Sequence, residues 1–99
     1  MPFELLETRI GAVGLIQPKL IGDERGFFVE TYRRSEFVEL GITEEMVQDN
    51  HSRSKYGIVR GMHFQIGEGA AKLVRCGRGK IVDVVVDLRR GSPTYGEWE

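Results

Sequence analysis

The sequence has little cysteine, proline or tryptophan and no long apolar run. Its 99 residues include one cysteine, three prolines and one tryptophan. A single cysteine, Cys76, cannot form an internal disulfide, so we expect a reducing, cytoplasmic compartment. No stretch reaches the ~18 consecutive apolar residues that a membrane helix needs, and the start, Met-Pro-Phe-Glu, does not have the pattern of a signal peptide. We therefore expect no membrane partner.

The chain also lacks an excess of either charge. Fourteen lysines and arginines stand against 15 aspartates and glutamates, which leaves a formal net charge of −1. Proteins with a general nucleic-acid surface carry a clear positive excess, so we predict no nucleic-acid partner, while a local basic pocket stays open. Hydrophobic residues make up 40% of the chain and charged residues 29%. These proportions are typical of a globular protein, and the length predicts one domain over residues 1–99.

Glycine, in contrast, is frequent. Thirteen glycines divide the chain into short apolar runs, which is typical of a β-rich domain with many turns. Ser35–Leu40 predicts a short helix, with Ser35 as its N-cap and Gly41 at its end. Strands are predicted at residues 13–16, 27–32, 58–64, 72–76 and 80–88, and residues 95–99 resemble the start of another. The pattern fits part of an antiparallel sandwich or barrel.

The clearest predicted strand, residues 80–88, carries two carboxylates. Alternation places Asp83 and Asp87 on one face and a row of apolar residues on the other. In a half-exposed sheet both carboxylates face solvent. If that face lines a barrel interior, Asp83 needs a cation, and Lys72 on the preceding predicted strand is a candidate. The pattern leaves both interpretations open.

His63 is the histidine with the strongest functional signal. It shares a predicted strand face with Gly61 and Gln65, so its surroundings are small and polar. A half-buried histidine satisfied by hydrogen bonds is the alternative. The other histidine, His51, lies twelve residues away and the chain has no Cys-x-x-Cys, so we predict no metal site.

Two segments are rich in hydrogen-bonding and aromatic side chains. Residues 47–54 fit either a polar loop or a site for a planar polar group such as a base, with a nearby arginine for phosphate. Residues 23–30 place Phe28 and Glu30 on one face after Arg25, which suits ring stacking and hydrogen bonding to one ligand. The alternative for this segment is a salt bridge beside two core phenylalanines.

Together these segments resemble the dTDP-4-dehydrorhamnose 3,5-epimerase family of the cupin superfamily. The matching stretches occur in the family's order over almost the whole chain. They are Gly-Asp-Glu-Arg-Gly-Phe-Phe-Val-Glu at 22–30, Val-Gln-Asp-Asn-His-Ser-Arg-Ser at 47–54, Arg-Gly-Met-His-Phe-Gln at 60–65, Lys-Leu-Val-Arg at 72–75 with Gly79, and Asp-Val-Val-Val-Asp-Leu-Arg at 83–89 followed by Ser-Pro-Thr-Tyr-Gly at 92–96.

The resemblance implies an all-β fold, a cupin-type jelly-roll barrel or sandwich with short helical turns, and a homodimer without a cofactor. It implies an isomerase of dTDP-L-rhamnose biosynthesis, which supplies a cell-wall polysaccharide precursor. Such an enzyme converts dTDP-4-keto-6-deoxyglucose to dTDP-4-keto-rhamnose. Family members are about twice as long, in keeping with a full-size domain. We therefore expect residues 1–99 to cover an N-terminal portion of the barrel, with the reprotonating tyrosine and the acidic partner of the base beyond it.

The resemblance also implies roles for individual residues. The catalytic positions are His63 as base, Lys72 as stabiliser of the enolate oxygen and Asp83 as an active-site carboxylate. The substrate-binding positions are Arg60 at the diphosphate, Gln48 and Asn50 at the nucleotide, and Arg25, Phe28 and Glu30 reaching in from the dimer partner. Three alternatives stay open: a dTDP-sugar mono-epimerase, a keto-sugar isomerase, or a catalytically silent cupin that binds a nucleotide-sugar.

Overall fold

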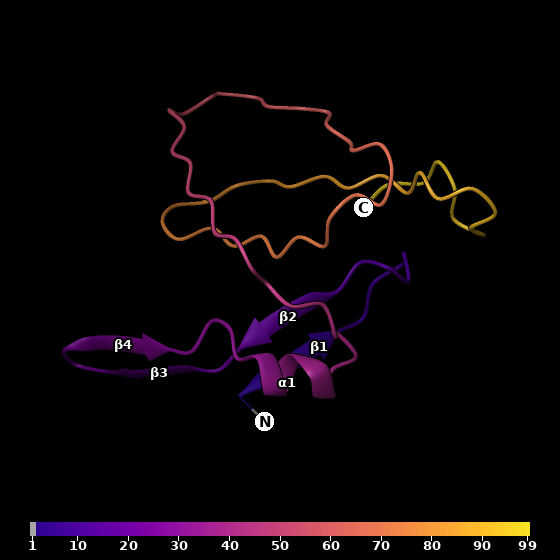
Figure 1. Cartoon of the computed structure of the whole chain (residues 1–99). Coiled ribbons are helices and arrows are strands. Elements are labelled where there is room, and N and C mark those ends of the chain that lie inside the picture. Colours follow the sequence, from indigo (N-terminus) through magenta and orange to yellow (C-terminus); the bar gives the residue numbers. More distant parts are fainter. Residues whose placement is uncertain (1) are drawn as a thin grey trace.

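The computed structural model describes residues 2–99. Its regular elements, in chain order, are β1 (Phe3–Leu6), β2 (Leu15–Pro18), β3 (Leu20–Asp23), β4 (Gly26–Val29) and α1 (Arg34–Glu39) (Figure 1). The strands form two antiparallel pairs, β1 with β2 and β3 with β4. The predicted strand at 13–16 corresponds to β2 and that at 27–32 to β4, each shifted, whereas β1 and β3 were not predicted. No helix of the described residues has the length and hydropathy to cross a membrane.

The first sheet and the helix enclose the small apolar core. Phe3 of β1 and Phe37 of α1 are both buried, and their rings meet edge to face with centroids 5.0 Å apart. The ring of Tyr32 packs on Phe37 in the same manner at 4.7 Å. Edge-to-face contacts of this kind add to the free energy gained by burying the rings. The helix is thus held by one fully buried side chain against β1.

The helix ends as predicted but does not begin as predicted. Gly41 has a φ of +89°, which glycine adopts without steric cost, and the amide of Ile42 bonds to the carbonyl of Phe37 at 2.9 Å. This arrangement is a Schellman motif and stops the helix at Gly41. The N-cap position is Arg33, without a side-chain capping bond, so the prediction that Ser35 caps the helix is wrong. The expected residues 35–40 otherwise match α1 within one residue.

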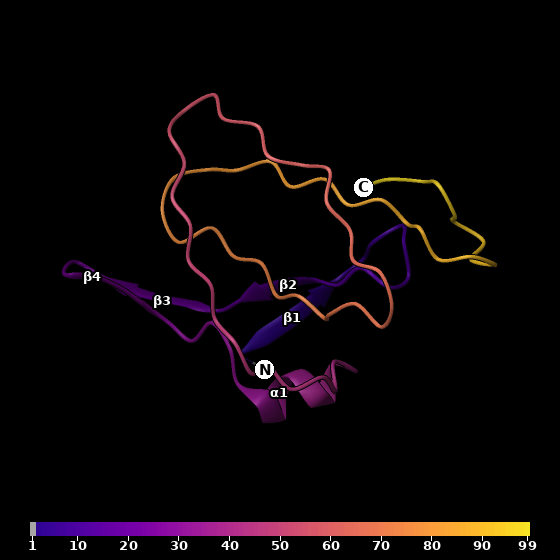
Figure 2. The ribbon, with the colours of Figure 1, turned by 45° about the horizontal axis from the view of Figure 1, so that its top comes forward.

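The hairpin of β3 and β4 projects away from the core (Figures 1 and 2). Its register pairs Leu20 with Val29 and Asp23 with Gly26, which leaves a two-residue turn at 24–25. Four of its apolar side chains are at least 59% exposed: Leu20, Ile21, Phe27 and Phe28. A two-stranded hairpin of this kind is marginally stable alone, because it buries little apolar surface.

The chain beyond α1 forms long loops above the two sheets (Figure 2). The predictions of strands at 58–64 and 72–76 are wrong for the described chain, since neither has ladder hydrogen bonds. The prediction at 80–88 is wrong except at residues 85–87, which bond to residues 97–99. Only Val86 forms a bridge, antiparallel to Trp98, which agrees with the expected strand start at 95–99. Alternating side chains predict which residues share a face, but a strand also needs a neighbour at hydrogen-bonding distance. Residues 58–64 and 72–76 have no such neighbour in the described chain, and within 80–88 only residues 85–87 have one.

Few side chains of the described residues are buried, because most of these residues lie on loops. Apart from the polar Asp87, the buried side chains of the described chain are Phe3, Ile10 and Phe37. The accessible surface is 9461 Å² and the radius of gyration 15.4 Å. A compact monomer of this mass exposes about 5,700 Å². Much apolar surface therefore lies open on the loops and on the β3–β4 hairpin.

Candidate functional site

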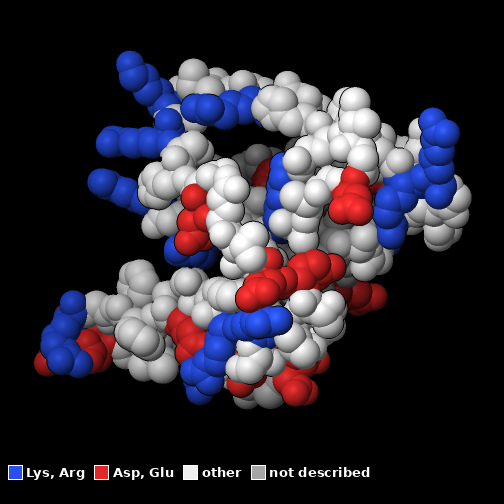
Figure 3. All heavy atoms as spheres, viewed as in Figure 1, with Lys and Arg blue, Asp and Glu red and all other residues white. Residues whose placement is uncertain are grey.

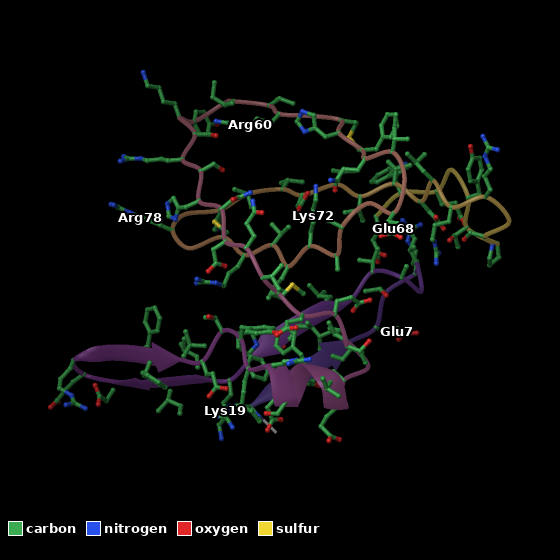
Figure 4. All side chains as sticks on the ribbon, in the orientation of Figure 1. Glu7, Lys19, Arg60, Glu68, Lys72 and Arg78 are labelled. Carbon is green, nitrogen blue, oxygen red and sulfur yellow. The ribbon has the colours of Figure 1, made fainter. Side chains whose placement is uncertain are left out.

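The predicted site residues lie on three parts of the chain. Arg25 and Phe28 belong to the β3–β4 hairpin, and Glu30 follows it directly. The others lie on the loops after α1, where Figure 4 shows the labelled Arg60 and Lys72 in the upper part of the molecule, away from the sheets. Those on the loops are Gln48, Asn50, Arg60, His63, Lys72 and Asp83.

At the hairpin tip, Arg25 is held by the turn. The amide of Arg25 donates to Oδ1 of Asp23 at 2.9 Å, and its guanidinium donates to Oδ2 at 2.6 Å. These bonds lower the pKa of Asp23, since they favour its charged form. Next to this pair lies an open hollow of about 290 Å³ that Phe27 and Phe28 also line. The tip thus combines an exposed cation with aromatic rings, the pairing that stacking on a base and contact with a phosphate require.

The polar segment after α1 is partly organised. The side-chain amide Nε2 of Gln48 donates to Oδ1 of Asn50 at 3.1 Å, which brings the two predicted nucleotide contacts together. Nε of Arg60 donates to the hydroxyl of Ser54 at 2.9 Å, so the predicted diphosphate contact lies beside the same segment. Glu30, in contrast, pairs with Arg33 at 2.5 Å, close to the start of the helix.

The three predicted catalytic side chains are exposed and not joined to one another. None of the five ion pairs in residues 2–99 connects Lys72 to Asp83. The pairing of Asp83 with Lys72, one of the two interpretations that the sequence left open, is thus not formed in the described residues and stays a prediction. His63 and Lys72 are likewise exposed. The reason is the one that affects the predicted strands: no sheet sets the spacing between the segments that carry these residues.

Basic side chains gather at one edge of this region. Figure 3 shows several lysines and arginines projecting from the upper left of the molecule, and Figure 4 places Arg60 and Arg78 near that edge. The formal net charge of the chain is only −1, so the basic edge is local. Such an edge attracts an anionic ligand such as a diphosphate.

The residues described here form no metal-binding group. Within residues 2–99 no three histidine, cysteine or acidic side chains gather as ligands. His63 has Gln65, not a second histidine, two positions later.

Sequence reasoning missed the best-ordered polar cluster. Asp87 was expected to share a solvent or barrel face with Asp83, yet its carboxylate is buried and bonded to Arg89, Ser92 and Thr94. These bonds, that of Arg89 first, hold the pKa of Asp87 far below its usual range. The signal was present in the sequence as an aspartate followed by arginine, serine and threonine at positions +2, +5 and +7.

Comparisons with known proteins agree with this arrangement of segments. A family model described as dTDP-4-dehydrorhamnose 3,5-epimerase matches residues 7–99. The dTDP-4-dehydrorhamnose 3,5-epimerase of Salmonella typhimurium is 52% identical over 96 residues, which cover 95% of this chain and 52% of that protein. A dTDP-4-dehydrorhamnose 3-epimerase of Streptomyces niveus is 48% identical over 92 residues, covering 91% of this chain and 44% of the relative.

A solved structure matches the whole course of the chain. The crystal structure of dTDP-4-dehydrorhamnose 3,5-epimerase from Elizabethkingia anophelis superposes with a TM-score of 0.89 at 42% identity, covering 100% of this chain and 55% of that one. The predicted fold class, a cupin-type all-β fold with short helical turns, is thereby confirmed. The chain spans about half the length of the curated relatives it matches. On the match over residues 7–99 and the identity of these relatives, the chain belongs to the dTDP-4-dehydrorhamnose 3,5-epimerase family.

Proposed function

We propose that the chain acts as a dTDP-4-dehydrorhamnose 3,5-epimerase, without a cofactor and in the cytoplasm. The observation that carries the proposal is the family match over residues 7–99, because it spans all nine candidate site residues. Its single cysteine, Cys76, is free, which suits a reducing compartment. The substrate is dTDP-4-keto-6-deoxyglucose, and the configuration is inverted at the two carbons beside the ketone.

The proposed chemistry explains why these residue types are needed. A proton beside a ketone is acidic only when the enolate that forms is stabilised. In the proposal the His63 imidazole removes this proton and the Lys72 ammonium donates a hydrogen bond to the enolate oxygen. Asp83 supplies a negative charge that favours the charged form of the lysine once the two approach.

Nucleotide binding is assigned to loop residues that hydrogen-bond to their neighbours. The Gln48–Asn50 pair suits hydrogen bonding to a base, and Arg60, held by Ser54, suits the diphosphate. The basic edge in Figure 3 supports the same assignment, since the ligand carries negative charge on its diphosphate.

We infer that the protein works as a homodimer in which the β3–β4 hairpin reaches the partner's site. The support is the hairpin's shape and surface: it projects from the core, and Phe27 and Phe28 are each 69% exposed. In the proposal Arg25, Phe28 and Glu30 contact the nucleotide bound by the other subunit. Burying such rings against a second copy provides the apolar contact that the hairpin lacks in one chain.

Solvent-deuterium exchange tests the function. The full chain is incubated in D₂O with dTDP-4-keto-6-deoxyglucose, and the sugar is analysed by NMR and mass spectrometry. We expect deuterium at both carbons beside the ketone, and His63→Ala should slow exchange by about 10²–10⁴-fold because the base is lost. Intact dTDP binding without any exchange would contradict the epimerase and favour a silent nucleotide-sugar-binding cupin.

Substituting two lysines one at a time distinguishes a role of Lys72 at the enolate from a nonspecific effect of its positive charge. Lys72→Ala should lower the exchange rate by about 10²–10³-fold and change dTDP affinity by less than about threefold, since the enolate forms only during reaction. Lys80→Ala, an exposed lysine in the same region, is the control and should leave both unchanged. Equal losses of rate and affinity in Lys72→Ala would overturn the enolate role.

A mono-epimerase is the second candidate, favoured by the 48% identity to the dTDP-4-dehydrorhamnose 3-epimerase of Streptomyces niveus. The same experiment distinguishes the two. Deuterium at one carbon only would identify the mono-epimerase.

A further inference from the structure

The most completely bonded charged group of the described chain is Asp87, for which the proposed chemistry has no role. Its side chain is 1% exposed, whereas that of its partner Arg89 is 54% exposed. Oδ1 accepts bonds from the amide and Nε of Arg89 at 2.9 and 3.0 Å. Oδ2 accepts bonds from the Arg89 guanidinium at 2.9 Å, the Ser92 hydroxyl at 2.5 Å and the Thr94 hydroxyl at 2.6 Å. Both carboxylate oxygens are therefore occupied by donors.

Every one of these donors comes from the turn that follows Asp87. Ser92 also accepts a bond from the Arg89 guanidinium at 3.1 Å and from the amide of Thr94 at 3.2 Å. A buried charge is tolerated when it is paired and its lone pairs are bonded, and removal of such a group leaves its donors unsatisfied. The shape of the turn at 89–96 thus depends on a negative charge at Asp87.

The backbone of Asp87 closes the hairpin to which this turn belongs. Its amide donates to the carbonyl of Glu97 at 2.9 Å, and its carbonyl accepts the amide of Gly96 at 2.7 Å. Two residues earlier, Val85 and Glu99 exchange two backbone bonds of 2.9 Å. One residue therefore sets both the turn and the register of residues 85–87 against residues 97–99.

This hairpin is also tied to the start of the chain. The carboxylate of Glu99 accepts the amides of Arg9 at 3.1 Å and Ile10 at 3.3 Å, and the Arg9 guanidinium bonds to the carbonyl of Trp98. Ile10 is buried and precedes β2. The segment in front of Asp87 is thereby fixed relative to the first sheet, and Asp83 lies on that segment, four residues before Asp87.

We propose that Asp87 is a positioning residue: by holding the turn at 89–96 and the register of residues 85–87 against 97–99, it places Asp83 for the reaction. The role in the reaction rests on the proposed function, whereas the role in the hairpin does not. Asp87 itself exchanges no proton during turnover. Its bonds keep it charged at any pH at which the protein works, in agreement with the lowered pKa.

The first experiment measures the hairpin directly. Amide hydrogen exchange of Val85, Asp87 and Glu99 is followed by NMR in the full chain and in Asp87→Asn, which keeps the side-chain volume and removes the charge. We expect their protection to fall by at least about tenfold, because these amides are bonded across the register that Asp87 sets. Asp23→Asn is the matched control: Asp23 also accepts bonds from an arginine two residues later, but its side chain is 50% exposed. It should leave the protection unchanged.

The second experiment tests whether Asp87 affects the reaction through Asp83. Asp87→Asn should lower kcat for sugar deuteration by about tenfold with little change in KM, because a misplaced group affects the reacting geometry more than binding. In an Asp83→Asn background the same substitution should lower kcat by less than about twofold, since the two changes act through one group. A merely structural role would give the same loss in both backgrounds.

Each result decides the proposal. Unchanged amide protection in Asp87→Asn, or equal kcat losses in the two backgrounds, overturns it. If the wild-type chain deuterates no sugar, the proposed function fails, and amide protection alone decides whether Asp87 sets the register. Should Asp87→Asn not fold, the double variant Ser92→Ala and Thr94→Val removes the two hydroxyl donors and keeps the charge pair. Full protection in that variant would also overturn the proposal.

Discussion

Two turns in this molecule share the order aspartate, any residue, arginine, and the chain uses them differently. In both, the arginine amide donates to Oδ1 of the aspartate at 2.9 Å and the guanidinium bonds back to the carboxylate. Asp23 has these partners only, and its side chain is 50% exposed. Asp87 adds two hydroxyl donors, and its side chain is 1% exposed. The same local motif is therefore exposed at the tip of the β3–β4 hairpin around Asp23, and buried and bonded to further residues around Asp87.

The difference follows from what surrounds each turn. Around Asp87, residues 92–99 return along the chain and supply hydroxyls and backbone partners. The β3–β4 hairpin, in contrast, has only its own two strands. An exposed ion pair contributes little to stability, because water competes for both charges, whereas a buried and fully bonded one is costly to break. We therefore expect substitutions at the first turn to affect association and those at the second to affect stability.

The largest expected effect concerns dimer formation. Leu20 and Phe27 share one face of the β3–β4 hairpin, since the register pairs Leu20 with Val29 and Gly22 with Phe27. The double change Leu20→Ser and Phe27→Ser should raise the dimer dissociation constant by at least about 100-fold, because each buried apolar side chain contributes about 1.5–3 kcal/mol. Analytical ultracentrifugation measures this constant. Tyr56→Ser, at an exposed loop tyrosine, serves as control, and an unchanged dimer in the double variant would remove the hairpin from the interface.

Substitution of Arg25 should affect dTDP binding and not stability, whereas substitution of Arg89 should affect stability and not dTDP binding. Arg25→Ala should weaken dTDP binding by about tenfold, because a charged hydrogen bond to phosphate is lost, with no change in the melting temperature. Arg89→Ala should lower the melting temperature and leave dTDP affinity within about twofold, since Arg89 bonds to Asp87. Calorimetric titration and thermal unfolding measure both quantities. The same response in the two variants would abolish the distinction between the turns.

Replacing Asp87 or Asp23 with asparagine compares how much each turn contributes to stability. Asp87→Asn should lower the melting temperature by roughly 5–10 °C, because several bonds to a buried charge are weakened in a small domain. Asp23→Asn should lower it by less than about 1 °C, as expected for an exposed pair. A fall of similar size in both variants would show that burial is not what distinguishes them.

The smallest expected effect is the pH dependence of the stability that Asp87 contributes. The pKa of Asp87 is lowered in the folded protein from an ordinary value of 3.8. Its contribution to stability is therefore complete above that value and is lost as the pH falls toward the folded pKa. The stability difference between wild type and Asp87→Asn, measured by urea unfolding, should be constant from pH 5 to pH 7 and shrink below about pH 4. A difference that grows on acidification would contradict this.

Local signals in the sequence predicted local structure well. The helix near 35–40 and its stop at Gly41 were predicted, because signals such as a terminal glycine act within a few residues. The segment Asp-Glu-Arg-Gly at 23–26 begins and ends with residue types that favour turns, and it forms the tip of the β3–β4 hairpin. The strands β1 and β3 were missed, since four-residue strands carry too few alternating positions to identify.

Features that depend on distant partners were not predicted. Residues 80–88 have the clearest strand pattern, yet only Val86 forms a bridge, because pairing needs a neighbour that the pattern does not specify. Asp87 was grouped with Asp83 by alternation, and its burial arises from Ser92 and Thr94 folding back onto it. The roles of His63 and Lys72 stay predictions that the kinetic variants test.

Complementation between two defective chains tests most directly the claim that the β3–β4 hairpin of one subunit completes the site of the other. Arg25→Ala impairs the hairpin that a subunit lends to its partner, and His63→Ala impairs the base of its own site. Dissociated and reassociated together, and assayed with substrate well below its KM, the variants should recover about a quarter of the wild-type exchange rate, because half of the dimers are mixed and each has one of its two sites intact. No recovery beyond the sum of the separate variants, with mixed dimers present, would contradict the account.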